Sequence, residues 1–269
     1  ISATVRNLSY NFMERSILQE VEFTSGYYVD TLRPQAQGFV ISDAPACLKS
    51  VQIKGWDAGT AGDVTTIKIT TGTTSVPSVG ARVLASRSIT ISGGSSVWWN
   101  VLFAEPVCLP VLNSGNAYWI IAENPASAAN GSIWHYENSN VYIPAARAAS
   151  ADGGANWTTE ADEEVFRVYY SSCIEVSYYN GDPDAGGTYI GVSTIPLINT
   201  NQTRVSTITW TATAPEEYKN IYVYIDRAYK IGESDETNNK AFNTIAVSSA
   251  PDKVTSFTAS TNSTTAIAL

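Results

Sequence analysis

The stretch YYNGDPDAGGTYIGVSTI, residues 178–195, decides the fold of this chain. Aromatic and β-branched side chains fill its two ends, and a Gly/Asp/Pro cluster separates them, which is the pattern of two antiparallel strands joined by a turn. A second stretch, IYVYIDRAYKIGESDETNNKAFNTIAV at residues 221–247, repeats the pattern around an acidic, asparagine-rich loop. Together they predict two hairpins of a small β-sandwich.

The composition predicts an all-β protein. Only 15% of the 269 residues are charged, whereas the chain holds 15 Tyr and 7 Trp, and such side chains suit a pleated, half-buried surface. Short alternating segments separated by Gly, Ser, Asn and Pro favour sandwiches or barrels over a parallel sheet. One stretch, NFMERSILQEVEF at residues 11–23, has helical spacing, although a strand or an irregular linker fits it equally well.

Charge and hydropathy exclude several classes of partner. The net charge of −9 argues against nucleic acid and anionic membranes. No apolar run approaches the ~20 residues that span a bilayer, and no signal peptide is visible, so we expect an excised or mature piece of a longer chain. Five Asn-x-Ser/Thr sequons begin at Asn7, Asn130, Asn156, Asn201 and Asn262, which would permit glycosylation of an extracellular protein.

Residues 178–195 and 221–247 resemble the CARDB module, an immunoglobulin-like β-sandwich of bacterial and archaeal surface and adhesion proteins. Such modules act as spacers or binding platforms, so the resemblance implies extracellular architecture without catalysis. The N-terminal ISATVRNLS also resembles the second strand of a CARDB domain. Its alternation of Ile1, Ala3 and Val5 with polar residues predicts a strand with one buried face.

Residues from about 17 to 172 resemble a jelly-roll module of secreted, surface and phage-tail proteins. The resemblance rests on the order of segments such as CLKSVQIKGW, WWNVLFAEPVCLPVLNSGNAYWII and SIWHYENSN. We therefore expect a jelly roll at residues 12–172 inserted into a CARDB sandwich made of residues 1–11 and 173–248. Closing so long a loop costs little, because closure entropy grows only logarithmically with loop length. Alternatively, residues 1–16 are the first strand of the jelly roll, in which case Val5 would pack far from Val176 and Ile225.

Residues 249–269, SAPDKVTSFTASTNSTTAIAL, resemble the opening strands of a fibronectin type III domain. An orphan strand of this kind can add to the open sheet edge of another subunit. This segment, or the N-terminal strand, is therefore predicted to complete the sandwich of a neighbouring molecule. The alternative is that the segment simply begins a further domain.

Three cysteines match no zinc or redox spacing. Cys47 and Cys108 both lie at the edge of strand-like runs, and a disulfide between them would close a loop of about 60 residues and contribute roughly 4 kcal/mol. Two buried free thiols are an equally good interpretation. Cys173, at the expected domain junction, is predicted to be unpaired.

No residue pattern predicts catalysis. His135, the only histidine, lies inside the strand-like SIWHYE, and no nucleophile motif accompanies it. The segment SADGGANW, residues 150–157, resembles the Asp-box of sialidases and related β-proteins, which implies a structural hairpin turn. Acidic loops offer weak calcium candidates and no other cofactor is expected; the candidates are Asp182, Asp184, Asp235 and Glu236.

Aromatic side chains could form a platform for stacking sugars. Trp98 and Trp99 are adjacent, so one of them faces outward from a strand, and Tyr136 or Tyr142 could accompany it. A contact between domains or subunits explains an outward aromatic side chain equally well.

The sequence thus predicts a non-enzymatic extracellular protein that self-associates into a fibre or array beside neighbouring domains of a longer chain. A carbohydrate-binding region of a secreted hydrolase or peptidase, with polysaccharide as its partner, is the main alternative. A virion tail or decoration protein is a third.

Overall fold

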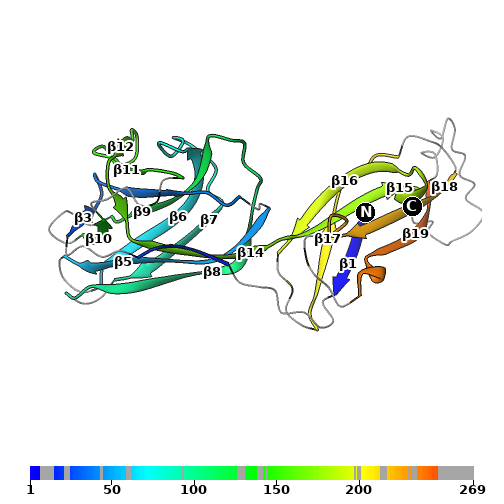
Figure 1. The fold of residues 1–269 in the computed structure, drawn as a ribbon, viewed down its shortest axis with the longest axis horizontal. Coiled ribbons are helices and arrows are strands. Elements are labelled where there is room, and N and C mark those ends of the chain that lie inside the picture. The colour runs from blue at the N-terminus through cyan, green and yellow to red at the C-terminus, as the bar shows by residue number, and fades with distance from the viewer. Residues whose placement is uncertain are drawn as a thin grey trace, which may run out of the picture.

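The computed structural model is built of antiparallel strands. It describes residues 1–6, 15–20, 25–42, 45–58, 62–91, 94–125, 131–137, 142, 144–196, 198, 201–212, 217–229, 231 and 235–247. Within these ranges, every strand pairing is antiparallel and helical structure is limited to short 3₁₀ turns, so the expected all-β class is confirmed. Two bodies lie side by side, joined where β14 (Phe166–Ser172) runs into β15 (Ile174–Asn180) (Figure 1).

The first body packs two sheets face to face. One sheet has the order β13-β10-β5-β14-β2, with β3 on β10 and β8 on β5, and the other has the order β12-β11-β4-β9-β6-β7. The strands are β2 (Arg15–Gln19), β3 (Gly26–Val29), β4 (Gln35–Phe39), β5 (Ala46–Asp57), β6 (Val64–Thr73), β7 (Ala85–Thr90), β8 (Val97–Leu109), β9 (Asn116–Glu123), β10 (Ser132–Glu137), β11 (Arg147–Ala149), β12 (Thr158–Glu160), β13 (Glu163–Glu164) and β14 (Phe166–Ser172).

Alternation along the central strands forms the core of this body. β5 buries Val51 and Ile53, and β6 buries Ile67 and Ile69, with half-buried residues between them. These side chains meet between the two sheets in one apolar cluster. The stretch with helical spacing contains β2 instead, because pairing with β14 gives its backbone hydrogen-bond partners.

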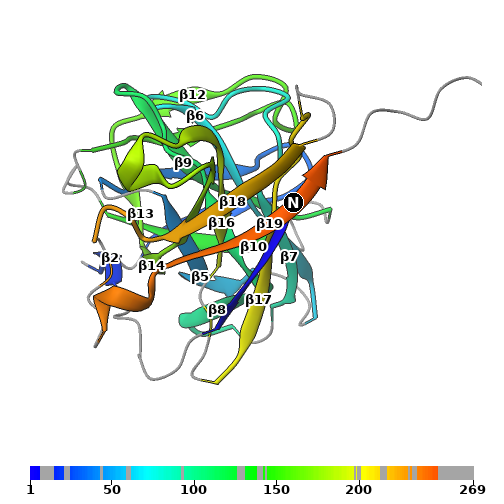
Figure 2. The same ribbon diagram turned by 90° about the vertical axis from the view of Figure 1, so that its right-hand side faces the viewer.

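The second body packs the four-stranded sheet β16-β15-β18-β19 against the pair β1-β17. The strands are β1 (Ser2–Arg6), β15 (Ile174–Asn180), β16 (Thr188–Ile195), β17 (Thr203–Thr207), β18 (Glu217–Ile225) and β19 (Lys240–Val247). Val5 lies in the same apolar cluster as Val176 and Ile225. The chain therefore begins in the second body, passes through the first, and returns (Figures 1 and 2).

The turns of this body follow from local capping. Between β15 and β16, Asp182 caps the single 3₁₀ turn η2 (Pro183–Ala185) by accepting from the Asp184 N–H at 3.0 Å, and Gly186 ends it with a φ of 86°. Before β19, Asp235 caps η3 (Glu236–Asn238) by accepting from the Thr237 N–H at 2.9 Å. Both hairpins predicted from the sequence are thereby closed.

Candidate functional site: an open edge of the second sandwich

A groove with a volume of about 580 Å³ lies between β1 and the inner face of β18 and β19. Residues 1–5 form one wall. Ile221, Val223 and Ile225 of β18 and Ala241 and Ile245 of β19 form an apolar floor, and Asn238, Asn239, Phe242 and Asn243 also line the groove. The groove therefore combines an apolar floor with polar side chains, and it runs along the length of a strand.

The groove exists because the smaller sheet is narrow. Immunoglobulin-like sandwiches commonly pair sheets of four and three strands, whereas the described residues here give sheets of four and two. Val176 is buried beneath the covered part of the sheet, but Val223 and Ile225 are only half-buried and Ala241 is exposed. A strand beside β1 would cover them.

Two edge strands border this groove. Among the described residues, β1 pairs only with β17, and β19 pairs only with β18. The outer edge of each strand therefore presents backbone N–H and C=O groups without a strand partner. An apolar floor between two such edges can accept an extended peptide, with the ladder giving affinity and the floor selecting alternate side chains.

Ion pairs join the start of β19 to the turn between β15 and β16, outside the residues that line the groove. Lys240 Nζ lies 3.0 Å from Asp182 Oδ1 and 2.6 Å from Asp184 Oδ2. Hydrogen bonds from Lys240 to Asp184 and Asp182 raise the pKa of the lysine. The Asp184 backbone N–H, and then Lys240, lower the pKa of Asp182. Sequence analysis missed Lys240, because nothing local shows that it faces a loop 56 residues earlier.

Three of the four acidic residues named as weak calcium candidates make hydrogen bonds to other groups of the protein. Asp182 and Asp184 bind the ammonium of Lys240, while Asp235 caps η3 and also accepts from the Thr237 hydroxyl at 2.6 Å. The side chain of Glu236 lies outside the described residues. Within the part of the chain that the structure describes, the three cysteines form the only group of three or more acidic, histidine or cysteine side chains close enough to share a metal ion.

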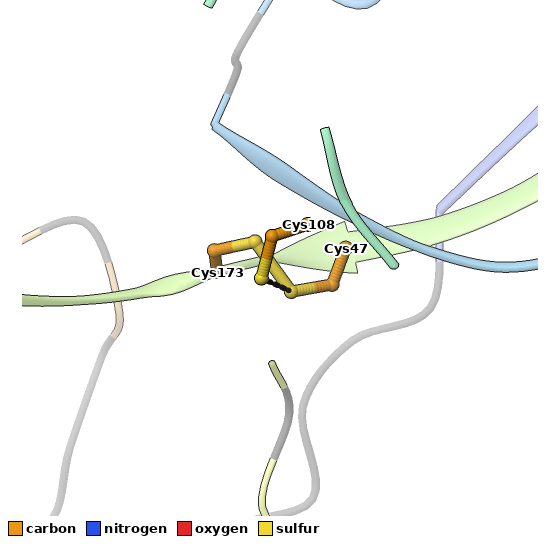
Figure 3. A group of neighbouring side chains, drawn as sticks. All are labelled: Cys47, Cys108 and Cys173. Atoms are coloured by element: carbon orange, nitrogen blue, oxygen red, sulfur yellow. Dashed lines mark hydrogen bonds between the residues drawn. A yellow bond between two sulfur atoms is a disulfide. The ribbon is translucent and has the colours of Figure 1, made fainter. Parts of the chain in front are cut away.

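The cysteines differ from expectation. The sequence leaves open a Cys47–Cys108 disulfide or two free thiols and predicts an unpaired Cys173. The structure instead joins Cys47 to Cys173, with a Cα–Cα distance of 5.2 Å, and leaves the Cys108 thiol free. Cys47 on β5 lies between β8, which carries Cys108 directly opposite it, and the end of β14, which Cys173 follows, and Figure 3 shows the three side chains together. Sequence spacing could not decide between Cys108, which lies opposite Cys47 on β8, and Cys173, which directly follows β14.

The aromatic candidates lie in different places. Trp99 is 8% exposed and belongs to the core, whereas its neighbour Trp98 is half-buried on the opposite face, as strand alternation requires. The guanidinium of Arg167 lies 3.9 Å from the centre of the Trp98 ring. Tyr136 packs on Tyr27, with ring centroids 4.5 Å apart. These side chains do not form one platform.

The side chains of Tyr142 and His135 pack against other aromatic rings. The Tyr142 hydroxyl accepts from the Val40 N–H at 2.9 Å, and its ring packs edge-on against Phe166. His135 is buried in β10 and meets the edge of the Trp56 ring, with centroids 4.7 Å apart. Both positions agree with packing roles.

The Asp-box forms the predicted hairpin turn between β11 and β12. Asp152 accepts from the backbone N–H and the side-chain amide of Asn156, at 2.9 and 2.6 Å, and the Ser150 hydroxyl donates to it. These bonds, led by the Asn156 amide, lower the pKa of Asp152 to about 2. The side chain of Asn156 therefore adds a hydrogen bond to the one that its backbone makes to Asp152.

A buried ionic network in the first body escaped sequence analysis. Arg147 is 1% exposed, its Nε donates to Asp162 at 2.7 Å, and a terminal nitrogen lies 3.4 Å from Glu164. Its guanidinium also stacks 3.8 Å from the centre of the Tyr27 ring. Burial raises the pKa of Glu164 well above its usual value, and Arg147 opposes this. An arginine amid alanines in AARAAS was the only local signal.

Comparisons with known proteins identify one segment. The CARDB family model matches residues 173–243, so most of the second sandwich is a CARDB domain. No curated protein matches the chain. Among the described residues, no helix is long and apolar enough to cross a membrane.

Two solved structures resemble the fold at 15% identity. The structure of the cysteine protease and lectin-like domains of Cwp84, a surface-layer-associated protein of Clostridium difficile, has a TM-score of 0.37 and covers 52% of this chain. The structure of clostridial Cwp84 after propeptide cleavage has a TM-score of 0.41 and covers 59%. The chain spans only 32% and 40% of those two structures. At this level the likeness carries no argument about activity or partners.

Proposed function

We propose that this protein is a non-enzymatic structural or adhesive component of a cell surface, which assembles with copies of itself by strand addition. The observation that carries the proposal is the apolar groove between the outer edges of β1 and β19. The match of residues 173–243 to the CARDB family supports it, because CARDB modules act as spacers or binding platforms in surface and adhesion proteins. In this proposal residues 12–172 are a domain inserted between residues 1–11 and 173–248.

The proposed occupant of the groove is residues 249–269 of a second copy. This segment follows β19 and ends in TTAIAL, where Thr265, Ile267 and Leu269 alternate with alanines and fit a half-buried strand. Figure 2 shows the arrowhead of β19 beside the start of β1, so a segment that doubled back after β19 would run parallel to β1. A segment from a second copy can instead run antiparallel, like every described pairing in this chain.

The test is assembly of purified protein with the groove filled. Ala241 is exposed and lines the groove, so Ala241→Trp should occupy it. Thr244→Trp is the matched control, because Thr244 is exposed on the same strand outside the groove. Sedimentation velocity over a range of concentrations and negative-stain microscopy are the readouts.

We expect oligomers or filaments from the unchanged chain and from Thr244→Trp. We expect monomers from Ala241→Trp and from a chain that lacks residues 249–269. Assembly that persists in both of these variants, or a chain that stays monomeric at every concentration, would contradict the proposal.

A further inference from the structure

The three cysteine side chains meet where the two sandwiches join. Cys47 Sγ is bonded to Cys173 and lies 3.6 Å from Cys108 Sγ (Figure 3). All three sulfur atoms lie within 4.8 Å of one another. The central cysteine therefore has two alternative partners, one of which is a free thiol.

Both pairings suit disulfide geometry without movement of the backbone. Cys47 and Cys173 have a Cα–Cα distance of 5.2 Å. Cys47 and Cys108 are directly opposite each other in the antiparallel ladder of β5 and β8. Directly opposed antiparallel residues have Cα atoms about 4.5–5.5 Å apart, which lies within the range of disulfides.

We infer that Cys47 is shared between two disulfides that interconvert by thiol–disulfide exchange within the molecule. The Cys108 thiolate attacks Cys47 Sγ, the new S–S bond forms, and the bond from Cys47 to Cys173 breaks. Cys173 leaves as a thiolate and takes up the proton that Cys108 has lost. No outside oxidant or reductant is needed, because one disulfide replaces another.

The surroundings of Cys108 set the rate of exchange. Burial raises the pKa of this thiol, while Thr194 and the charge of Arg204 act in the opposite direction. Because only the thiolate attacks, exchange should be slow in acid and should accelerate about tenfold per pH unit below that pKa. Cys108 is half-exposed, so solvent can accept its proton.

The exchange would change which two segments of the chain the disulfide cross-links. Cys173 lies between β14 and β15, at the connection between the two sandwiches, so its bond to Cys47 fastens this connection to β5. A bond between Cys47 and Cys108 links two strands of the first sandwich only. The second form would therefore release the connection and cross-link β5 to β8 instead.

Disulfide mapping on the full chain tests the inference. Protein held at pH 5 is shifted to pH 8.5 for increasing times and then treated with N-ethylmaleimide. It is digested without reduction and analysed by mass spectrometry. We expect label on Cys108 at early times, a growing share on Cys173, and matching Cys47–Cys108 peptides, with Cys47 itself unlabelled.

Two variants provide controls. Cys108→Ser should hold the Cys47–Cys173 bond and Cys173→Ser the Cys47–Cys108 bond, each without a free thiol. The unchanged chain alone decides the matter if either variant fails to fold. A single disulfide that never changes with time or pH would overturn the inference. So would three thiols that react only after a chelator removes bound zinc, because the cluster would then be a metal site.

Discussion

At the scale of single residues, Glu163 is a buried carboxyl whose ionisation should lower the stability of the fold. It is 1% exposed and accepts a hydrogen bond from the side chain of Gln37. Burial raises the pKa of Glu163 from 4.5 to about 8, and Gln37 and Arg147 oppose the rise. The proton therefore binds more tightly in the folded state than in the unfolded chain.

The sign of the resulting pH dependence follows. The contribution of Glu163 to the free energy of unfolding is largest below pH 4.5 and is lost as the pH rises through about 8. Glu163→Gln keeps an acceptor for Gln37 and removes the charge. We expect it to be neutral at pH 4 and to stabilise the first sandwich by about 1–3 kcal/mol at pH 9, measured by urea unfolding.

The control for this prediction is Glu160→Gln. Glu160 is 38% exposed and lies 3.7 Å from the same arginine, Arg147. Its replacement should change the free energy of unfolding by no more than about 0.5 kcal/mol at either pH. Equal effects of the two substitutions at pH 9 would show that burial of Glu163 is not the cause.

The adjacent tryptophans give a second prediction at this scale. Trp99→Ala should reduce the free energy of unfolding by about 3–5 kcal/mol, because the ring is buried in the core. Trp98→Ala should cost much less, because that ring is half-buried under Arg167. Thermal unfolding of both variants is the measurement. Loss of polysaccharide retention by Trp98→Ala at unchanged stability would instead favour the carbohydrate-binding interpretation.

At the scale of elements, the two-residue periodicity of apolar side chains predicted which face of a strand is buried. A strand with one buried face must alternate apolar and polar residues. This periodicity placed Ile1, Ala3 and Val5 on one side, and the structure packs all three against the same apolar cluster. The hairpins around Asp182 and Asp235 were also predictable from their capping residues. The strand β2 was ambiguous, because pairing with β14 rather than local spacing decided it.

The long-range partners of these elements could not be predicted. Cys47 has two neighbouring cysteines, and Lys240 meets Asp182 across 58 residues of sequence. The groove depends on the number of strands that pair beside β1, and no local sequence pattern predicts that number. Contacts of this kind arise from the order of strands in a sheet, and periodicity carries no information about that order.

The packing of β1 gives a prediction for this element. Val5 is 5% exposed, whereas Val205 on its partner strand β17 is 60% exposed. Val5→Ala should destabilise the second sandwich by about 1–3 kcal/mol, and Val205→Ala should have almost no effect. Chemical denaturation followed by tyrosine fluorescence measures both. Equal stability of the two variants would mean that β1 contributes little to the fold of the second sandwich.

At the scale of the whole molecule, each sandwich has its own apolar cluster, and the chain enters and leaves through the second body. The first body is covered on both inner faces, whereas the second leaves the inner face of β18 and β19 open along the groove. Assembly through the second body would cover that face and leave the first body exposed for contacts with a surface.

The most direct test follows the backbone amides of β1 by hydrogen–deuterium exchange. A chain that lacks residues 249–269 is measured with and without a synthetic peptide of that sequence, and Ala241→Trp in the same shortened chain is the control. We predict that the peptide slows exchange of the amides of residues 2–5 that face the outer edge of β1 at least tenfold, and that it has no effect on Ala241→Trp, because an added strand would pair with the outer edge of β1. Unchanged exchange in β1 at saturating peptide would contradict strand addition at this edge.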